Sequence, residues 1–260
     1  MSPAGRKPTR RDLGGDQVEG RQAVRELLVA GRRRVFELMV ASSDEGRGSL
    51  RDLMDLASRS RVPVKQVSAG KLAAAARTES PQGVIARCAP LDEVEIEALV
   101  KRRKGVPPLL LAVDGVTDPG NLGALLRAAE CAGVTGVVLP RHRAVHITPT
   151  VAKAAAGAIE HLPMTVVPGL PATLERLKAA GLWVVGLDGG GEQRIDRLTL
   201  ASEPLIMVFG AEGRGLSPLV RKRCDVVAAI PLRGHLASLN VAAAGAIACY
   251  EVARQRAQDG

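Results

Sequence analysis

Residues 230–251, IPLRGHLASLNVAAAGAIACYE, predict the end of a strand, a loop that contains a glycine, and a helix whose first turns carry little side-chain bulk. Pro231 favours the end of the strand because it has no amide donor, and Ser238 or Asn240 is suited to cap the helix that follows. Residues 242–246 are all alanine or glycine. A helix face this small lets another backbone or a flat ligand approach closely.

The strand that ends at Pro231 is the last of five strongly apolar segments, in each of which the apolar run is interrupted by Gly, Pro or Asp. They are LLLAVDG (109–115), GVVLP (136–140), WVVGLDG (183–189), LIMVFGAEG (205–213) and VVAAIPL (226–232). Such runs are typical of strands buried on both faces of a parallel sheet, and helical patterns fall between them. We therefore expect a parallel α/β domain over residues 109–256, with ligands bound beyond the carboxyl ends of the strands.

The first part of the chain predicts a smaller α/β domain over residues 18–90. Helical spacing of apolar residues near 24–28 and 50–57 alternates with strand patterns at 35–40 and 62–67. A basic turn, Arg32, Arg33 and Arg34, follows the first of these helices. It either contacts phosphates or lies solvated in its loop, and the sequence favours neither alternative.

Two further segments connect or flank these domains. Residues 1–17 combine basic residues with Gly and Pro and show no apolar period, which predicts a disordered basic tail. Residues 91–108 change from acidic to basic and end in a Pro pair, which predicts a linker containing a short helix.

The charge balance points to a polyanionic partner. The chain has 36 Lys and Arg against 27 Asp and Glu, a net charge of +9. Nucleic acid is the first partner to consider, although a basic surface without a ligand is the alternative. The aromatic residues are limited to Phe36, Trp183, Phe209 and Tyr250, so recognition by base stacking is disfavoured. An RNA partner would be held through phosphates, sugars and shape.

Four cysteines and four histidines are spaced too irregularly for a zinc site or a disulfide framework. We expect no metal, and we expect the cysteines to be small buried hydrophobic residues in a reducing compartment. The sequence has neither an apolar run long enough for a membrane helix nor a signal peptide. A cytoplasmic protein without a membrane partner is the expectation.

Glycines follow several of the predicted strands, but their spacing matches neither GxGxxG nor GxxxxGK[ST]. Residues 114–133 are more informative. Asp118 and Pro119 should start a helix with Asn121 in its first turn, and Arg127, nearly two turns later, should lie close to the same face. Such an arginine pairs with a carboxylate, Glu130 or Glu212 being available, or it binds a phosphate.

Three segments in this order, NLGALLRAAE (121–130), VFGAEGRGLS (208–217) and residues 230–251, resemble the motifs of the SpoU (TrmH-like) RNA ribose 2'-O-methyltransferases of the SPOUT superfamily. Upstream, VEGRQAVRELL (18–28) and PQGVIARC (81–88) are similar to the L30-like substrate-binding domain of the RlmB-like branch. That branch modifies a guanosine ribose in the peptidyl-transferase region of 23S rRNA.

The resemblance implies a deep trefoil knot in the parallel-sheet domain, a homodimer, and S-adenosylmethionine bound in the knot. It also implies two sets of site residues. The cofactor cleft would be lined by Leu187, Gly210, Ala211, Glu212, Ile230, Pro231, Leu232 and Leu239, and the catalytic set would be Asn121, Arg127, Glu212, Ser238 and Asn240.

The resemblance implies that Arg127 activates the ribose hydroxyl. Because an arginine in a protein stays protonated, we expect Arg127 to hold the neighbouring phosphate and stabilise the developing alkoxide. Glu212 has a structural alternative, which is to hold loop amides or pair with Arg127.

The expected function is methylation of a guanosine ribose in 23S rRNA. Within the family, a tRNA ribose methyltransferase is the alternative, and outside catalysis an RNA-binding ribosome-assembly factor that kept the fold is another. The predicted N-terminal domain favours ribosomal RNA.

Overall fold

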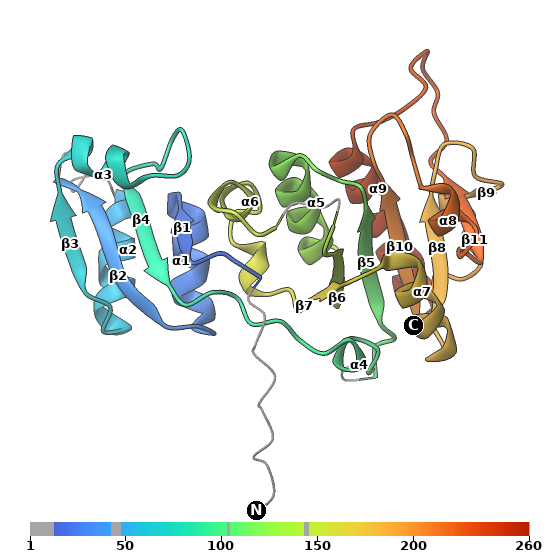
Figure 1. The fold of residues 1–260 in the computed structure, drawn as a ribbon, viewed down its shortest axis with the longest axis horizontal. Helices are drawn as coiled ribbons and strands as arrows, with labels where there is room; N and C mark the ends of the chain where they lie inside the picture. The colour runs from blue at the N-terminus through green and yellow to red at the C-terminus, as the bar shows by residue number, and fades with distance from the viewer. Residues whose placement is uncertain (1–12, 43–47, 103–104, 143–145, 260) are drawn as a thin grey trace, which may run out of the picture.

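The computed structural model describes residues 13–42, 48–102, 105–142 and 146–259. Within these residues the chain forms two α/β units, one on a four-stranded sheet and one on a seven-stranded sheet (Figure 1). In that view the four-stranded sheet lies to the left and the seven-stranded sheet to the right, with α1 and α6 between them.

The N-terminal unit has the strand order β1-β4-β2-β3. Strand β4 is antiparallel to both β1 and β2, whereas β2 and β3 are parallel. Its elements are β1 (Gln17–Glu19), α1 (Arg21–Ala30), β2 (Val35–Ala41), α2 (Gly48–Arg59), β3 (Val64–Val67), α3 (Ala69–Ala75) and β4 (Val84–Cys88). The two helices and two strands predicted between residues 24 and 67 are all present.

The C-terminal unit is a parallel α/β sheet, as its apolar segments predict. The order is β7-β6-β5-β10-β8-β11-β9, and each neighbouring pair is parallel. The strands are β5 (Leu109–Asp114), β6 (Gly136–Pro140), β7 (Met164–Val167), β8 (Trp183–Leu187), β9 (Gln193–Arg194), β10 (Leu205–Gly210) and β11 (Val226–Ala229). The helices are α4 (Ile96–Leu99), α5 (Pro119–Cys131), α6 (Pro149–Ala154), α7 (Leu170–Ala179), α8 (Pro218–Arg221) and α9 (Val241–Asp259), with 3-10 turns η2 (Ala158–Glu160) and η3 (Ile195–Arg197).

Both faces of the larger sheet are covered by helices. Because side chains alternate along a strand, Leu109 and Leu111 of β5 enter the core shared with α5, α6 and α9, whereas Leu110 enters the core shared with α4 and α7. This burial on both faces explains why the strands are almost wholly apolar.

Helices α5 and α9 approach each other closely at a glycine. A Cβ on Gly245 of α9 would lie 2.0 Å from Leu125 Cδ1 of α5. Both residues are buried. The small residues near the start of α9 therefore make room first for a neighbouring helix of the same chain.

The segments before and after the N-terminal unit, predicted as a disordered tail and a linker, both contribute buried residues to the C-terminal unit. Leu13, which falls in the predicted disordered tail, is 2 % exposed in the core of the C-terminal unit, so the prediction was wrong for residues 13–17; residues 1–12 lie outside the described part. Two apolar residues of the predicted linker, Ile96 and Leu99 in the short helix α4, are buried against the sheet. Their apolar side chains explain the difference.

A half-buried arginine also fastens the end of this connection. Arg256 of α9 donates hydrogen bonds to the carbonyls of Pro107, Pro108, Ala201 and Glu203. Burial lowers the pKa of its guanidinium to about 10. In the described part of the chain, none of the helices is long and apolar enough to cross a membrane.

Candidate active site

A cavity of about 380 Å³ opens beyond the carboxyl ends of β8, β10 and β11. This is where a parallel sheet is expected to bind ligands. The turn after β10 and the loop before α9 form its sides, so the second and third motif segments meet there. The lining residues are Leu187, Asp188, Gly189, Gly190, Phe209, Gly210, Ala211, Glu212, Gly213, Arg214, Gly215, Ala228, Ile230, Leu232, Ala237, Ser238, Leu239, Val241 and Ala244.

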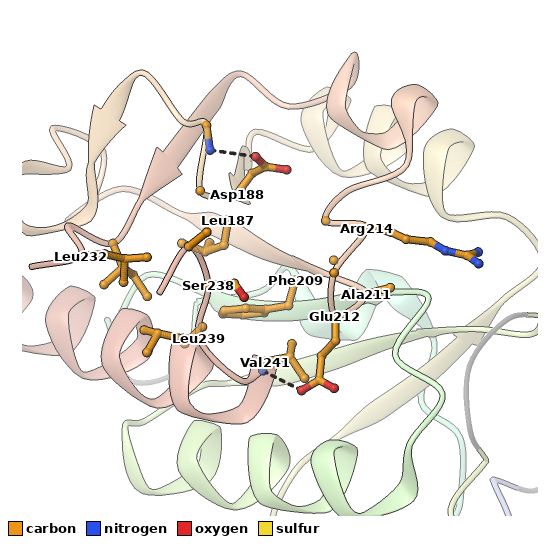
Figure 2. A pocket seen from close by; sticks show the side chains of 18 of the residues that line it. Leu187, Asp188, Phe209, Ala211, Glu212, Arg214, Leu232, Ser238, Leu239 and Val241 are labelled. Carbon is orange, nitrogen blue, oxygen red and sulfur yellow. Dashed lines mark hydrogen bonds between the residues drawn. The ribbon is translucent and has the colours of Figure 1, made fainter. Parts of the chain in front are cut away.

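The structure brings most of the expected cleft residues to this cavity. Among the expected cofactor-binding residues, the described lining includes all except Pro231, which lies next to Ile230 and Leu232. Figure 2 shows Glu212 pointing toward the start of α9 at Val241, whereas the side chain of Arg214 extends away from the cavity. The wall is thus apolar on the side of the leucines and carries carboxylates at Asp188 and Glu212.

Three of the expected catalytic residues form one hydrogen-bonded group. Asn240 Nδ2 donates to Asn121 Oδ1 over 2.8 Å and to Glu212 Oε1 over 2.7 Å. Asn240 Oδ1 accepts from the amides of Ala242 and Ala243, at 2.9 and 3.3 Å, and so caps α9. Because the oxygen faces these amides, the amide nitrogen must face Asn121 and Glu212.

Glu212 is held by the same helix start, since its Oε1 also accepts from Val241 N over 3.3 Å. The backbone of Asn121 is fixed from the other side, because its backbone N–H donates to Oδ1 of Asp118, the N-cap of α5, over 2.6 Å. The start of α5 with Asp118 and Pro119 is as predicted. Ser238 lines the cavity, and the cap of α9 is Asn240 rather than Ser238.

Arg127 lies apart from this group. Its place close to the face of Asn121 was wrongly predicted, because six helical residues turn through about 600°, which leaves the two side chains about 120° apart. The same six residues separate them by about 9 Å along α5. Arg127 is exposed, and within the described residues it forms neither an ion pair nor a hydrogen bond with Glu130, Glu212 or any other side chain.

Asp188 is a cavity residue that the sequence analysis missed. Its Oδ1 accepts from Gly190 N over 3.0 Å and pairs with Arg221 Nη1 over 3.1 Å, and its carboxylate also accepts from the amide of Leu216. Partial burial opposes the charged form, but these donors together hold the pKa of the Asp188 carboxyl below its usual value. Asp188 therefore joins the loop after β8 to the turn after β10 and to α8.

The signal for Asp188 was present in the segment WVVGLDG, where an aspartate ends a buried strand. Its partners Leu216 and Arg221 are more than 25 residues away, which the local pattern does not reveal.

The cysteines are structural in three of the four positions. Burial raises the pKa of Cys88 and of Cys224 to about 11, and that of Cys249 to about 12. Thiols with such pKa values are poor nucleophiles and poor metal ligands at neutral pH. Cys131, at the end of α5, is exposed and Cys224 is half-buried, which corrects the expectation that all four are buried. Among the described residues there is no cluster of three or more His, Cys, Asp or Glu that could hold a metal ion.

Comparison with known proteins assigns both units. Residues 108–250 match the model of the SpoU rRNA Methylase family, which covers more than half of the chain. The chain belongs to the SpoU rRNA methylase family. Residues 17–94 match a second model, described as RNA 2'-O ribose methyltransferase substrate binding, and this segment coincides with the four-stranded unit.

Relatives of this SpoU methylase match it over nearly its whole length. The 23S rRNA (guanosine-2'-O-)-methyltransferase RlmB of Pseudomonas putida is 41% identical over 246 residues, which are 93% of this chain and 97% of the relative. A putative TrmH family tRNA/rRNA methyltransferase of Bacillus subtilis, YacO, is 37% identical over 93% of this chain and 96% of its own.

Solved structures of SpoU proteins share its fold. The SpoU methyltransferase AviRb from Streptomyces viridochromogenes, in complex with AdoMet, has a TM-score of 0.77 at 24% identity and covers 93% of this chain and 90% of its own. The A. aeolicus TrmH/SpoU tRNA modifying enzyme has a TM-score of 0.53 at 28% identity, covering 63% of this chain and 81% of its own.

Proposed function

We propose that this protein is an S-adenosylmethionine-dependent RNA ribose 2'-O-methyltransferase that methylates a guanosine of 23S rRNA. The observation that carries the proposal is the near full-length match, through both units, to a relative named for that reaction. A match limited to the seven-stranded unit would support RNA methylation but would not identify the RNA that is methylated.

The extent of the matches favours ribosomal RNA over tRNA. The A. aeolicus tRNA modifying enzyme aligns with 63% of this chain, whereas the P. putida ribosomal RNA enzyme aligns with 93%. A tRNA substrate is the second candidate, because the name of the B. subtilis relative includes both RNA classes.

For the domains, we propose an L30-like substrate-binding domain at residues 18–90, a linker at 91–108 and a knotted methyltransferase domain at 109–256. The family matches at 17–94 and 108–250 support these limits. The strand order supports the knot, because β11 pairs with β8 and β9 while α9 returns to pack on α5.

The cavity fits S-adenosylmethionine. Its volume is within the range of small-molecule sites, roughly 300–1,000 Å³. Glycines let backbone segments pack closely around it: a Cβ on Gly210 would lie 2.2 Å from Gly215 C, and one on Gly191, beside the lining, 2.6 Å from Ala228 C. Backbone amides and carbonyls suit a purine and a ribose, Leu187 and Leu239 suit a flat base, and Asp188 and Glu212 suit hydroxyl or ammonium groups.

When bound, the cofactor supplies a methyl group on a positively charged sulfur. The chain then has to align a ribose hydroxyl with that group and to help in removing its proton. We propose that Asn121, Glu212 and Asn240 act as one unit in this alignment, because Asn240 joins the other two directly. Ser238, at the cavity wall, is placed to contact the hydroxyl or the cofactor.

Arg127 is proposed to bind the phosphate next to the target ribose and to stabilise the developing alkoxide. Its exposure and its lack of an ion pair with any described residue leave the guanidinium available for a phosphate. Proton removal is then assigned to that phosphate, to water or to a polar side chain rather than to the arginine.

A homodimer is part of the proposal. Ala243, Ile247 and Tyr250 are exposed and follow one another at helical spacing on α9, with Ile247 44% and Tyr250 53% exposed. An apolar stripe of this kind is typical of a surface that packs on another chain. We place the enzyme in the cytoplasm, where ribosomal RNA would be its substrate.

The test is a map of ribose methylation in RNA from cells with and without this protein. We expect one 23S rRNA guanosine to lose its 2'-O-methyl group, and the wild-type gene to restore it while a gene with Asn240→Asp does not. An unchanged ribosomal map with one tRNA site lost would refute the ribosomal substrate. Absence of S-adenosylmethionine binding by calorimetry would support the assembly factor instead.

A further inference from the structure

The two units meet at an ion pair that is almost completely buried. Arg33, in the turn between α1 and β2, donates from Nε to Glu160 Oε2 over 2.9 Å and from Nη2 to Glu160 Oε1 over 2.5 Å. Glu160 ends the 3-10 turn η2 of the C-terminal unit. The side chains are 5 % and 1 % exposed. This bidentate geometry fixes both the distance and the direction between the two units.

The same guanidinium also holds its own unit. Arg33 Nη1 donates to the carbonyl of Gly15 over 2.5 Å and to that of Ala89 over 2.8 Å. Gly15 precedes β1 and Ala89 follows β4, so one side chain gathers two strand ends of the small sheet and the carboxylate of the large unit. The alternatives offered by the sequence, phosphate contact or solvation, do not apply to Arg33.

A glycine allows the surfaces to come together beside this pair. Gly157 has a φ of 92°, and a Cβ there would lie 2.3 Å from Glu26 Cβ of α1. The carboxylate of Glu26 meets His161 Nε2 over 3.1 Å, and Arg32 Nη1 donates to the His161 carbonyl over 3.2 Å. Helix α1 therefore rests directly on the backbone of the turn.

The chain crosses between the units twice. Leu13 is buried in the core of the C-terminal unit, and the next residues lead into β1. Gly14 forms a parallel bridge with Ile147, and its carbonyl accepts from Leu91 N, on the second crossing, over 3.0 Å. Two connections bound to each other resist rotation more than a single linker does.

Neighbouring domains in one chain usually move relative to each other unless their interface is extensive. Here a small rotation would break the bidentate ion pair while both charges stayed buried, and an unpaired buried charge costs free energy. The pair therefore makes small rotations away from the observed orientation unfavourable, while it adds little to the overall free energy of unfolding.

We propose that Arg33 and Glu160 are positioning residues that hold the four-stranded unit in one orientation, so that RNA bound by this unit reaches the cavity of the other at a fixed distance. The RNA part of this inference rests on the proposed function. The fixed orientation does not, so the two are tested separately.

The orientation is tested by electron–electron double resonance between spin labels on the native Cys131 and on Ser58→Cys, both exposed, in a Cys224→Ala background and diluted with unlabelled protein. We expect one narrow distance in the otherwise unaltered protein. Glu160→Gln, and the double variant Arg33→Met with Glu160→Leu, should broaden it. The double variant leaves no unpaired buried charge, so it keeps the test valid if the single variant unfolds.

The matched control is Glu97→Gln, which removes an exposed pair with Arg176, 65% and 62% exposed, within the C-terminal unit. It should leave the distance narrow. A broad distribution in the unaltered protein would overturn the fixed orientation, and a narrow one in the double variant would overturn the role of Arg33 and Glu160 in holding it.

The positioning role is tested by methyl transfer to 23S rRNA. In the double variant we expect the KM for RNA to rise about tenfold or more, because loosening lowers the effective concentration of the second site. The rate at saturating RNA and the Kd for S-adenosylmethionine should change little. An unchanged KM in a variant with a broadened distance would refute positioning, whereas the absence of methyl transfer in the unaltered protein would count against the proposed function and leave the distance result standing.

Discussion

Asn240 Nδ2 lies 2.7 Å from Glu212 Oε1, so the residue that caps α9 also holds the carboxylate of the cavity wall. The fold of the last helix and the geometry of the site are therefore linked through one side chain. A substitution at residue 240 separates the two roles only if it keeps the cap.

Asn240→Asp is such a substitution. Asp caps helices as well as Asn, so the melting temperature should fall little. The donor to Asn121 and Glu212 is lost, however, and two carboxylates are placed side by side. We expect the rate of methyl transfer to drop by about 10²–10³, as for the loss of a preorganised donor. Near wild-type turnover in a radiolabelled methyl-transfer assay would show that the three residues do not act together.

Arg127→Lys keeps the charge of the proposed phosphate contact and removes its planar fork. We expect a loss of about 10²-fold or more in kcat/KM with an unchanged Kd for S-adenosylmethionine by calorimetry. Arg176→Lys, an exposed arginine on α7, is the control and should behave as wild type. If the lysine variant turns over at the wild-type rate, the planar guanidinium of Arg127 is not needed for the reaction.

Asp188→Asn should lower the free energy of unfolding by an amount that depends on pH. The folded-state pKa of Asp188 lies below its ordinary value of 3.8, so the carboxylate stabilises the fold above that value and loses this effect as the pH falls through the folded pKa. Urea unfolding should show a stability gap between wild type and variant that is full above about pH 5 and closes at lower pH. A gap that stays constant down to the acid transition would contradict this role.

Gly245→Ala should destabilise the protein even though alanine favours a helix by about 1 kcal/mol. The new methyl group would meet Leu125 Cδ1 at 2.0 Å inside a closed core, and overpacking costs about 1–3 kcal/mol. The double variant with Leu125→Ala should be more stable than the sum of the single effects predicts. Simple additivity in chemical denaturation would mean that the two residues do not compete for space.

Ile247→Glu tests the homodimer. A charge in the middle of the α9 stripe should shift the protein toward monomer in sedimentation at micromolar concentration. Lys222→Glu, an exposed change after α8, is the control and should keep the wild-type mass. A wild-type protein that sediments as a monomer would refute the dimer itself.

Much of the fold could be predicted from the sequence because its strongest signals are local. The five apolar segments from residue 109 are buried strands since both faces of the sheet are covered, and Asp118 with Pro119 marks the start of α5. Strand β7 was missed because it has four residues and includes a polar Thr165. Leu13 was missed because one apolar residue in a polar segment carries no period.

The meeting of distant residues at one cavity was predictable where a resemblance supplied long-range information. Leu187, Glu212 and Leu239 reach one cavity from three separate segments, which local patterns cannot show. Arg127 was misplaced because spacing along the chain was read without the helical rotation. Arg33 is the clearest limit, because its partner Glu160 is 127 residues away.

The burial of Leu13 has a practical meaning for anyone who wishes to isolate the methyltransferase domain. A fragment that begins at residue 109 would lack Leu13, Ile96 and Leu99, three side chains that close the cores on both faces of its sheet. The exposed apolar area would favour aggregation. The smallest well-behaved form of this enzyme therefore includes the small unit, because the chain before β1 and the chain after β4 are pieces of the catalytic core.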